Sequence, residues 1–290
     1  MTNFPQIDMN GKVCVVTGGT SGIGWVSAYT LAQWGAHVIM IGRDQKRGLE
    51  AVERIHQKSL DGKGEFAPVD LSAKAEVQKF VEGFLENHDQ LDVLINNAGT
   101  TLLNRKLSVD GYEMTFAVNH LGHFLLTNLL LDTLKDSGPS RVINVSSDSH
   151  RGAKIDFDNL QGQSRYWVFR AYGQSKLANV LFTYELARRL NGTSVTVNAV
   201  HPGFVLTNMG QDNGWLIHKL VRLVMRLKGI SPEEGAKTIL YLATSPEVEG
   251  VTGKYFYKLK SVKSSSVSYD LVTARRLWQV SEELTGLAAS

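Results

Sequence analysis

Short apolar runs alternate with stretches of helical periodicity along the first two thirds of the chain. The apolar runs predict buried strands at 12–17, 37–42, 64–69, 91–95, 140–146 and 194–200. Between them, the spacing of apolar positions predicts helices at about 22–34, 44–58, 73–87, 111–135 and 171–190. No linker is long enough to mark a domain boundary. We therefore expect one α/β domain, a doubly wound parallel sheet with helices on both faces.

The last third of the chain predicts helices of other kinds. Ser231-Pro-Glu-Glu supplies an N-cap, a first-position proline and first-turn acids for a helix at 232–244, and a final helix is expected at about 268–285. Residues 214–228 form a basic, amphipathic segment. Three interpretations stay open: a substrate lid at about 208–230, a helix on a membrane surface, or a helix packed on the core.

Composition narrows the class of protein. The 290 residues are 43% hydrophobic with a net charge of +3 and no basic tract, which excludes a nucleic-acid partner. Cys14 lies within the first predicted strand and is expected to be a buried apolar residue. His150 and His201 lack partners at ligand spacing, so no metal site is expected. The first ten residues hold no long apolar run, which predicts a cytoplasmic protein without signal peptide or membrane span.

Candidate site residues follow the carboxyl ends of the predicted strands. Parallel sheets of this kind bind ligands in a crevice outside those ends. The residues that stand at or just past them are Thr17, Gly42, Asp70, Asn97, Ser147 and His201. We therefore expect a single crevice.

The turn after the first strand has the pattern T-G-x-x-x-G-x-G, from Thr17 to Gly24. Its glycines allow the backbone to approach a pyrophosphate, whose charge then lies at the N-terminus of the next helix. The second strand ends at Gly42-Arg43, without the acidic residue that would bind the ribose hydroxyls of NAD. Arg43 suits a 2′-phosphate, so NADP(H) is preferred. NAD(H) stays open because Asp44 follows directly.

Tyr172 and Lys176 lie one helical turn apart. Residues at i and i+4 share a helix face, so the phenol and the ammonium can meet over one substrate. A neighbouring positive charge favours phenolate, and we expect Lys176 to lower the pKa of Tyr172 toward the range of acid–base catalysis.

These motifs together resemble the short-chain dehydrogenase/reductase family, which implies a Rossmann-type fold. Further segments match that family in order: Asn96-Asn-Ala-Gly99, Asn119, Asn144-Val-Ser-Ser147 and the P-G-x-x-x-T loop from Pro202 to Thr207. Within the family, the segments 171–182, 185–190 and 274–281 are similar to the retinol dehydrogenase-like branch. Members of that branch often carry an N-terminal membrane anchor, and we expect this chain to differ from them in that respect.

The resemblance implies roles for individual residues. Tyr172 would exchange a proton with the substrate oxygen. Lys176 would lower the pKa of Tyr172 and bind the nicotinamide ribose. Ser147 would hold the substrate oxygen, with Ser146 as the competing candidate. Asn119 would hold a water that links Lys176 to solvent. The implied cofactor-binding residues are Gly18, Thr20, Ser21, Gly22, Ile23, Gly24, Arg43, Asp70, Leu71, Asn97, Ala98, Gly99, Tyr172, Lys176, Pro202, Gly203, Val205 and Thr207.

The implied activity is hydride transfer between NADP(H) and an apolar carbonyl or a primary or secondary alcohol of retinoid, steroid or ketone type. The segment 150–170 carries aromatic residues that would line the substrate pocket or pack within a loop: Phe157, Tyr166, Trp167 and Phe169. The alternative function is a nicotinamide-binding sensor with vestigial catalysis. Peripheral membrane contact through 214–228 and a homo-oligomer through the final helix are further expectations.

Overall fold

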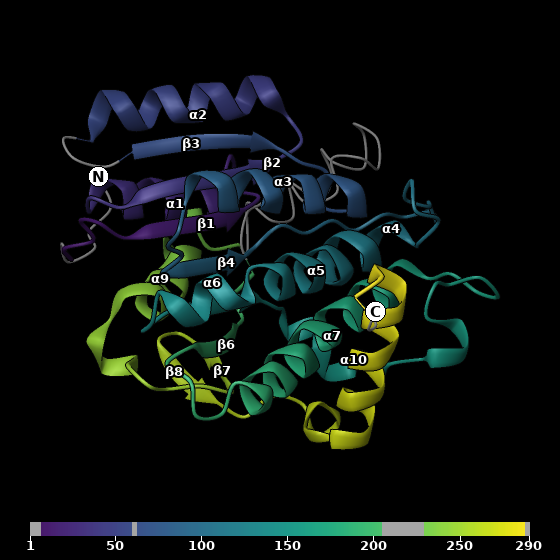
Figure 1. Ribbon diagram of the computed structural model, residues 1–290. Coiled ribbons are helices and arrows are strands. Elements are labelled where there is room, and N and C mark those ends of the chain that lie inside the picture. The colour runs from purple at the N-terminus through teal and green to yellow at the C-terminus, as the bar shows by residue number, and fades with distance from the viewer. Residues whose placement is uncertain (1–6, 60–62, 205–228, 288–290) are drawn as a thin grey trace.

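The computed structural model describes residues 7–59, 63–204 and 229–287, and one sheet runs through them (Figure 1). Its strand order is β3-β2-β1-β4-β5-β6-β7-β8. The strands are β1 Val13–Thr17, β2 His37–Gly42, β3 Lys63–Pro68, β4 Val93–Asn96, β5 Arg141–Val145, β6 Thr196–Val200, β7 Lys254–Tyr257 and β8 Lys260–Val262. All neighbours pair in parallel except β8, which is antiparallel to β7. This is a Rossmann-type order, and it confirms the predicted fold class.

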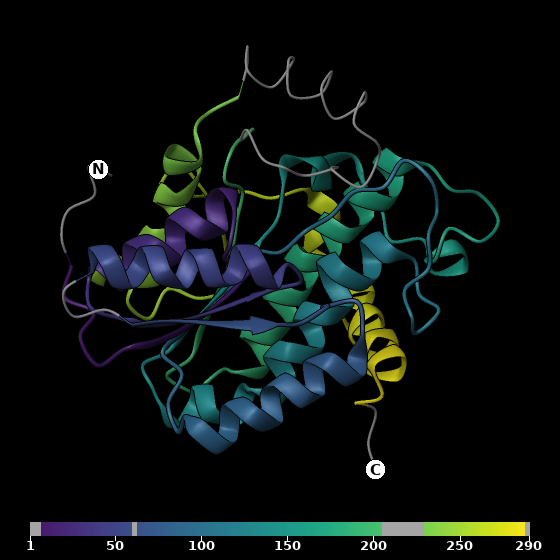
Figure 2. The same cartoon turned by 90° about the horizontal axis from the view of Figure 1, so that it is seen from above.

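Helices cover both faces of the sheet, as the view from above shows (Figure 2). One layer consists of α1 Gly22–Gln33, α2 Gln45–Lys58 and α9 Pro232–Thr244. The other consists of α3 Lys74–Asn87, α5 Gly122–Leu129, α6 Leu131–Asp136 and α7 Val168–Arg189. The last helix, α10 Leu271–Thr285, packs outside α7. Short helical turns complete the chain: α4 Met114–Phe116, η1 Ala117–Leu121, η2 Asp148–Gly152, η3 Phe157–Asn159, η5 Pro246–Val248 and η6 Ser266–Tyr269.

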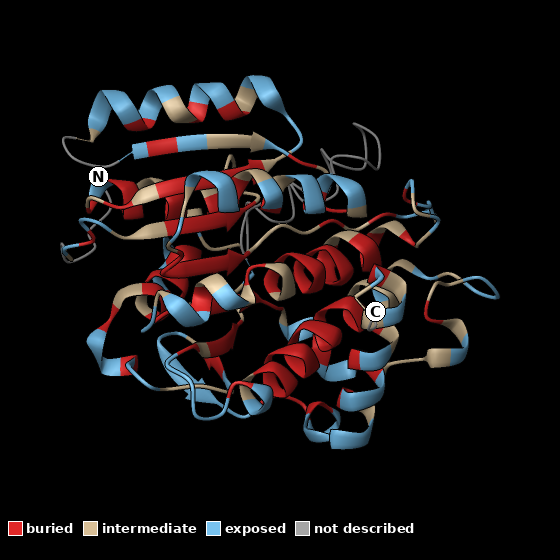
Figure 3. Cartoon of the chain, in the orientation of Figure 1, coloured by how far each residue is buried: buried red, intermediate tan, exposed pale blue. Residues whose placement is uncertain are grey.

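Alternation along the strands divides the core into two halves. Successive side chains of a strand point to opposite faces. In β1, Val16 packs in the cluster that contains α1 and α9, whereas Val15 packs with α3 and α5. Both valines are fully buried, as is most of the sheet (Figure 3). Five of the six apolar runs read from the sequence are therefore central strands, buried from both sides, whereas the run at 64–69 forms the edge strand β3 and is largely exposed.

The predicted helix at 111–135 is not continuous. Its first part divides into α4 and the π-helical turn η1, which lead into α5 and α6. Gly122 marks the change to α5, where a Cβ atom would lie 2.2 Å from the carbonyl oxygen of Leu71. A larger residue at 122 would therefore push α5 away from the end of β3.

Two strands have no counterpart in the sequence-based prediction. β7 and β8 extend the sheet beyond β6, and β7 places Phe256 in the core. The segment 205–228 lies outside the described residues. The lid predicted at about 208–230 falls on this segment, except for its last two residues. The single-domain assignment stays a prediction for the chain as a whole.

Candidate active site

The turn after β1 has the shape that an anion needs. Gly18 and Gly22 adopt φ values of +64° and +55°, which side chains rarely tolerate. A Cβ atom on Gly24 would lie 2.2 Å from the carbonyl oxygen of Gly18, so only glycine lets α1 approach the turn so closely. Ser21 precedes α1 without capping it through its side chain. The first N–H groups of α1 thus remain available, and the turn fits a pyrophosphate group.

A hydrogen-bonded junction joins this turn to the end of β4. The Thr17 Oγ1 atom accepts from the backbone N–H groups of Asn97 and Ala98, each at 2.9 Å. In return, Nδ2 of Asn97 donates to the carbonyl oxygen of Thr17 at 2.9 Å. Thr17 is fully buried, so these bonds are shielded from water. They hold Asn97, Ala98 and Gly99 beside the glycine-rich turn.

His123, which the sequence analysis overlooked, extends this junction to the π-helical turn. Its Nδ1 lies 3.1 Å from the carbonyl oxygen of Asn119, and its Nε2 lies 2.9 Å from Thr17 Oγ1. A carbonyl oxygen only accepts, so Nδ1 carries the proton and Nε2 accepts from the Thr17 hydroxyl. Burial and the charge of Lys176 lower the pKa of His123 to about 3. The ring is therefore neutral and structural.

The amide of Asn119 is held from both ends. Its Oδ1 accepts from the Thr100 N–H at 2.7 Å, and Nδ2 donates to the Thr100 carbonyl and to Ser175 Oγ, each at 3.0 Å. A Cβ atom on Gly99 would lie 3.5 Å from both Asn119 Oδ1 and Lys176 Nζ. Asn119 therefore lies at the predicted site, in a π-helical turn of the kind often found at functional positions. Its role in holding a water stays a prediction.

Three of the predicted catalytic side chains meet at the end of β5. Lys176 is 2% exposed, and its Nζ donates to the Val145 carbonyl at 3.1 Å. The same nitrogen lies 5.7 Å from the centre of the Tyr172 ring. The Ser147 side chain acts to lower the pKa of Tyr172, which is consistent with the serine lying near the phenol. The helix α7 thus brings the phenol and the amine to the serine, as the i,i+4 spacing predicts.

The two serines at the end of β5 have different surroundings. Ser146 is buried, and its Oγ donates to the backbone carbonyl of Lys176 at 2.8 Å. Ser147 is half-buried; its Oγ accepts from the Ser149 N–H and donates to Ser149 Oγ, each at 3.2 Å, and the side chain acts to lower the pKa of Tyr172. The geometry therefore favours Ser147 over Ser146 as the serine that faces the phenol.

The expected lowering of the Tyr172 pKa is not found in this structure. Tyr172 keeps part of its surface exposed, yet loss of solvation raises its pKa to about 12, and the Ser147 side chain only opposes the rise. Burial also lowers the pKa of Lys176 to about 8. A low-dielectric site disfavours both charged forms, so here burial outweighs the attraction between ammonium and phenolate.

The end of β2 is open where a ribose is expected. A Cβ atom on Gly42 would have its nearest neighbour, the Phe66 ring, at 3.5 Å and Thr20 Oγ1 at 3.6 Å. Arg43 is exposed beside it. Asp70 caps the turn after β3, accepting from the Ser72 N–H at 2.9 Å. Asp70 thus holds the turn before α3 and does not cap that helix, whose N-cap is Ala73, so the predicted cap role is wrong; its contact with adenine stays a prediction.

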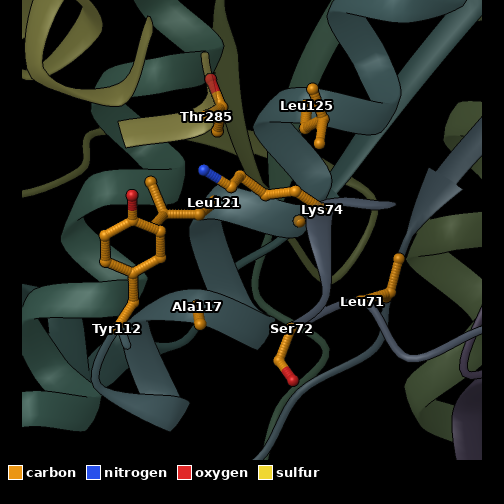
Figure 4. A pocket seen from close by; sticks show the side chains of 9 residues that line it. Leu71, Ser72, Lys74, Tyr112, Ala117, Leu121, Leu125 and Thr285 are labelled. Carbon is orange, nitrogen blue, oxygen red and sulfur yellow. The ribbon is translucent and has the colours of Figure 1, made fainter. Parts of the chain in front are cut away.

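Leu71 lies next to a different feature, a cavity of about 10 Å³ between α3, η1, α5 and α10 (Figure 4). Lys74 and Tyr112 reach across it and both donate to the carbonyl oxygen of Leu284, at 3.2 and 2.7 Å. These bonds cap the C-terminal end of α10. The cavity contains none of the predicted catalytic residues, and we assign it to the docking of that helix.

The loop after β6 is described only at its start. Gly203 adopts a φ of +97°, and a Cβ atom there would lie 2.6 Å from the Ile230 side chain. Ile230 donates its N–H to the Phe204 carbonyl at 2.8 Å. Pro202 and Gly203 thus follow β6 as expected, whereas the predicted contacts Val205 and Thr207 lie outside the described residues. Within the described part of the chain, no group of three His, Cys, Asp or Glu side chains could hold a metal ion.

Comparisons with known proteins agree with this geometry. The family model for short chain dehydrogenases matches residues 12–214. Human retinol dehydrogenase 14 is 44% identical over 96% of this chain and 88% of its own, and human polyprenol dehydrogenase is 43% identical over 95% and 86%. Among solved structures, an uncharacterised protein from Mycobacterium paratuberculosis has a TM-score of 0.79 at 35% identity, covering 97% of this chain and 96% of its own. The NADP complex of RhlG from Pseudomonas aeruginosa has a TM-score of 0.71 at 26% identity, covering 91% and 99%.

Proposed function

We propose a specific reaction for this chain, which belongs to the retinol dehydrogenase-like branch of the short-chain dehydrogenase family. It is a nicotinamide-dependent oxidoreductase acting on CH–OH groups. In our proposal it transfers hydride between NADP(H) and an apolar alcohol or carbonyl compound. The observation that carries the proposal is the position of the buried Lys176 amine, which lies 5.7 Å from the centre of the Tyr172 ring and 3.1 Å from the Val145 carbonyl at the end of β5, the strand that Ser147 follows. This group lies beside the glycine-rich turn. When bound, the nicotinamide supplies or accepts the hydride.

Tyr172 handles the proton in this proposal. Its hydroxyl donates to the substrate oxygen during reduction and accepts from it during oxidation, while Ser147 donates a second hydrogen bond that stabilises the developing charge. A phenol with a pKa near 12 is fully protonated at neutral pH, so it is ready to act as an acid. In the oxidative direction it must lose a proton first. We assign Lys176, whose pKa burial lowers to about 8, to take part in that loss.

The glycine-rich turn and the strand ends fit the coenzyme. Gly18, Gly22 and Gly24 leave room for the pyrophosphate, while Asn97, Ala98 and Gly99 line the path toward Lys176. For the 2′-phosphate we assign Arg43 and Thr20, whose Oγ1 lies 3.6 Å from the Cβ position of Gly42; Ser21, where a basic residue would strengthen the preference, keeps NAD(H) open. The absence of a carboxylate at position 42 supports NADP(H) over NAD(H), because an acid there would repel the phosphate.

An apolar substrate is supported by aromatic residues at the start of α7. Trp167 and Phe169 are 60% and 72% exposed, and their rings lie 5.8 Å apart. Phe169 shares the helix face of Tyr172, one turn away. Retinol and polyprenol, the alcohols named in the two relatives, are apolar molecules with a hydroxyl group. Within the described residues no helix is long and apolar enough to cross a membrane. Cytoplasmic location, peripheral membrane contact and a homo-oligomer stay predictions.

The direct test is a panel of apolar alcohols, aldehydes and ketones assayed with NADPH and NADP⁺. Tyr172→Phe removes only the hydroxyl and should lower kcat by ~10²-fold or more, the usual contribution of general acid–base catalysis, with the Kd for NADPH nearly unchanged. Tyr241→Phe, which removes an exposed hydroxyl bonded to Glu247, is the matched control. Normal turnover by Tyr172→Phe would refute the assigned role. Coenzyme binding without turnover of any substrate would favour a sensor.

A further inference from the structure

His150 is buried just past the end of β5 and is not among the residues assigned above. Its side chain is 0% exposed, three residues after Ser147 in the turn η2. Nδ1 lies 2.7 Å from the carbonyl oxygen of Ser147, and Nε2 lies 3.0 Å from the backbone nitrogen of Ser265. The ring therefore bridges two segments that are 118 positions apart in the chain.

The two partners determine the proton positions on this ring. The Ser147 carbonyl only accepts, so Nδ1 must carry a hydrogen. The Ser265 N–H only donates, so Nε2 must be unprotonated. The imidazole is thus held neutral and in one tautomer, and burial lowers its pKa in the same sense. The ring centre lies 4.8 Å from that of Tyr255, which limits rotation of the imidazole.

The far end of the bridge is itself anchored. The hydroxyl of Ser264 is hydrogen-bonded to Tyr184 at 2.7 Å and to Ser268 at 2.6 Å. Tyr184 is buried on α7, the helix that carries Tyr172 and Lys176. Ser265 therefore belongs to a segment fixed against the catalytic helix, and His150 uses that segment as a support.

We propose that His150 is a positioning residue, which fixes the peptide of Ser147 and thereby holds the serine side chain in its place at the end of β5 for the reaction. His150 touches neither substrate nor coenzyme in this proposal and acts through the Ser147 carbonyl alone. The inference rests on the proposed function, since it assigns Ser147 to the reaction. It predicts that the Ser147 bond, rather than the Ser265 bond, supports turnover.

Two substitutions separate these bonds. The amide nitrogen of asparagine is attached at Cγ, as Nδ1 is in histidine, so His150→Asn can still donate to Ser147. The amide of glutamine extends to the position of Nε2, so His150→Gln can accept from Ser265 but cannot reach Ser147. We expect His150→Asn to keep kcat within about threefold and His150→Gln to lose at least ~10-fold, because small misplacements of reacting groups are costly. The KM for NADPH should change in neither variant.

A double-mutant cycle shows whether the effect passes through the serine. In a Ser147→Ala background, His150→Gln should cause no further loss of kcat. The proposal would be overturned if His150→Gln lowered kcat equally in the wild-type and Ser147→Ala backgrounds. It would also be overturned if the Asn and Gln variants both lost kcat in proportion to the drop in their melting temperatures.

A nitrogen NMR spectrum of the histidine rings tests the bridge without any turnover. At pH 7, His150 should show the neutral Nδ1–H form, and a charged ring or an Nε2–H form would sink the proposal. Wild-type protein that turns over no substrate, while its His150 shows the Nδ1–H form, would refute the proposed function and leave the bridge standing. Full activity in Ser147→Ala would instead remove the serine from the reaction and refute the positioning role with it.

Discussion

At the scale of single residues, the site consists of side chains whose partners leave them little freedom. Asn119 uses its whole amide on Thr100 and Ser175, and His123 has a single neutral tautomer. Such groups keep their geometry before any ligand arrives, which lowers the cost of reaching the transition state. The sequence identified Asn119 but not His123, because the partners of His123 are identifiable only in the folded chain.

Gly42 offers the sharpest residue-level test of coenzyme choice. Its Cβ position is open, with ordinary contacts at 3.5 Å and beyond, so Gly42→Asp should fold normally. The new carboxylate would repel a 2′-phosphate and accept from ribose hydroxyls, so the ratio of kcat/KM for NADPH over NADH should fall by ~10-fold or more. Gly83→Asp on α3, where a Cβ atom would also meet open space, is the control. An unchanged ratio would contradict the assignment of this strand end.

At the scale of elements, α7 carries the proposed catalytic pair at one end and part of the core at the other. Tyr172 and the exposed Phe169 lie near its start, whereas Leu181 and Leu186 further along are fully buried. The apolar pattern predicted this helix at about 171–190, and the i,i+4 spacing predicted that Tyr172 and Lys176 share one of its faces. The π-helical turn η1 was not predictable in the same way, since it is defined by backbone hydrogen bonds and covers only five residues, too few for a period to be read. Strands β7 and β8 were missed because four and three residues show too little alternation.

The aromatic start of α7 should bind the apolar part of the substrate. Trp167→Ala and Phe169→Ala should each raise the KM for a long apolar alcohol by ~10-fold, since each removes apolar contact area of the order that large side chains supply. The melting temperature should barely change, because both rings are largely exposed. Leu49→Ala on α2, which removes another exposed apolar side chain, is the control. Equal KM values in all three variants would place the substrate elsewhere.

At the scale of the whole molecule, two buried histidines link stability to pH. Burial lowers the pKa of His120 to about 4 and that of His123 to about 3, against about 6.5 for an exposed ring. The unfolded chain binds these protons first, so acid favours unfolding. Each ring should therefore remove about 2 kcal/mol from the free energy of unfolding between pH 6.5 and 5, at ~1.4 kcal/mol per pKa unit.

Urea unfolding at several pH values measures this dependence. His120→Gln can keep the hydrogen bond to Ser281 Oγ, now 2.9 Å from Nε2, but cannot take up the proton. The free energy of unfolding of this variant should fall less steeply below pH 6.5, because the variant takes up about one proton fewer on unfolding than the wild type does. His56→Gln on the exposed face of α2 should leave the slope as it is. A wild-type stability that stays flat down to pH 5 would mean that these rings are accessible to water.

The same eight-stranded sheet also bears on how copies of the protein can associate. Both of its outermost strands are poor templates for further pairing: β3 exposes Lys63, Glu65 and Pro68, and β8 is three exposed residues that begin with Lys260. Charge, a missing proline N–H and short length each discourage a neighbour from adding a strand. Self-assembly by continuing the sheet from one molecule to the next is therefore disfavoured, and a homo-oligomer would have to join through surfaces other than these two edges.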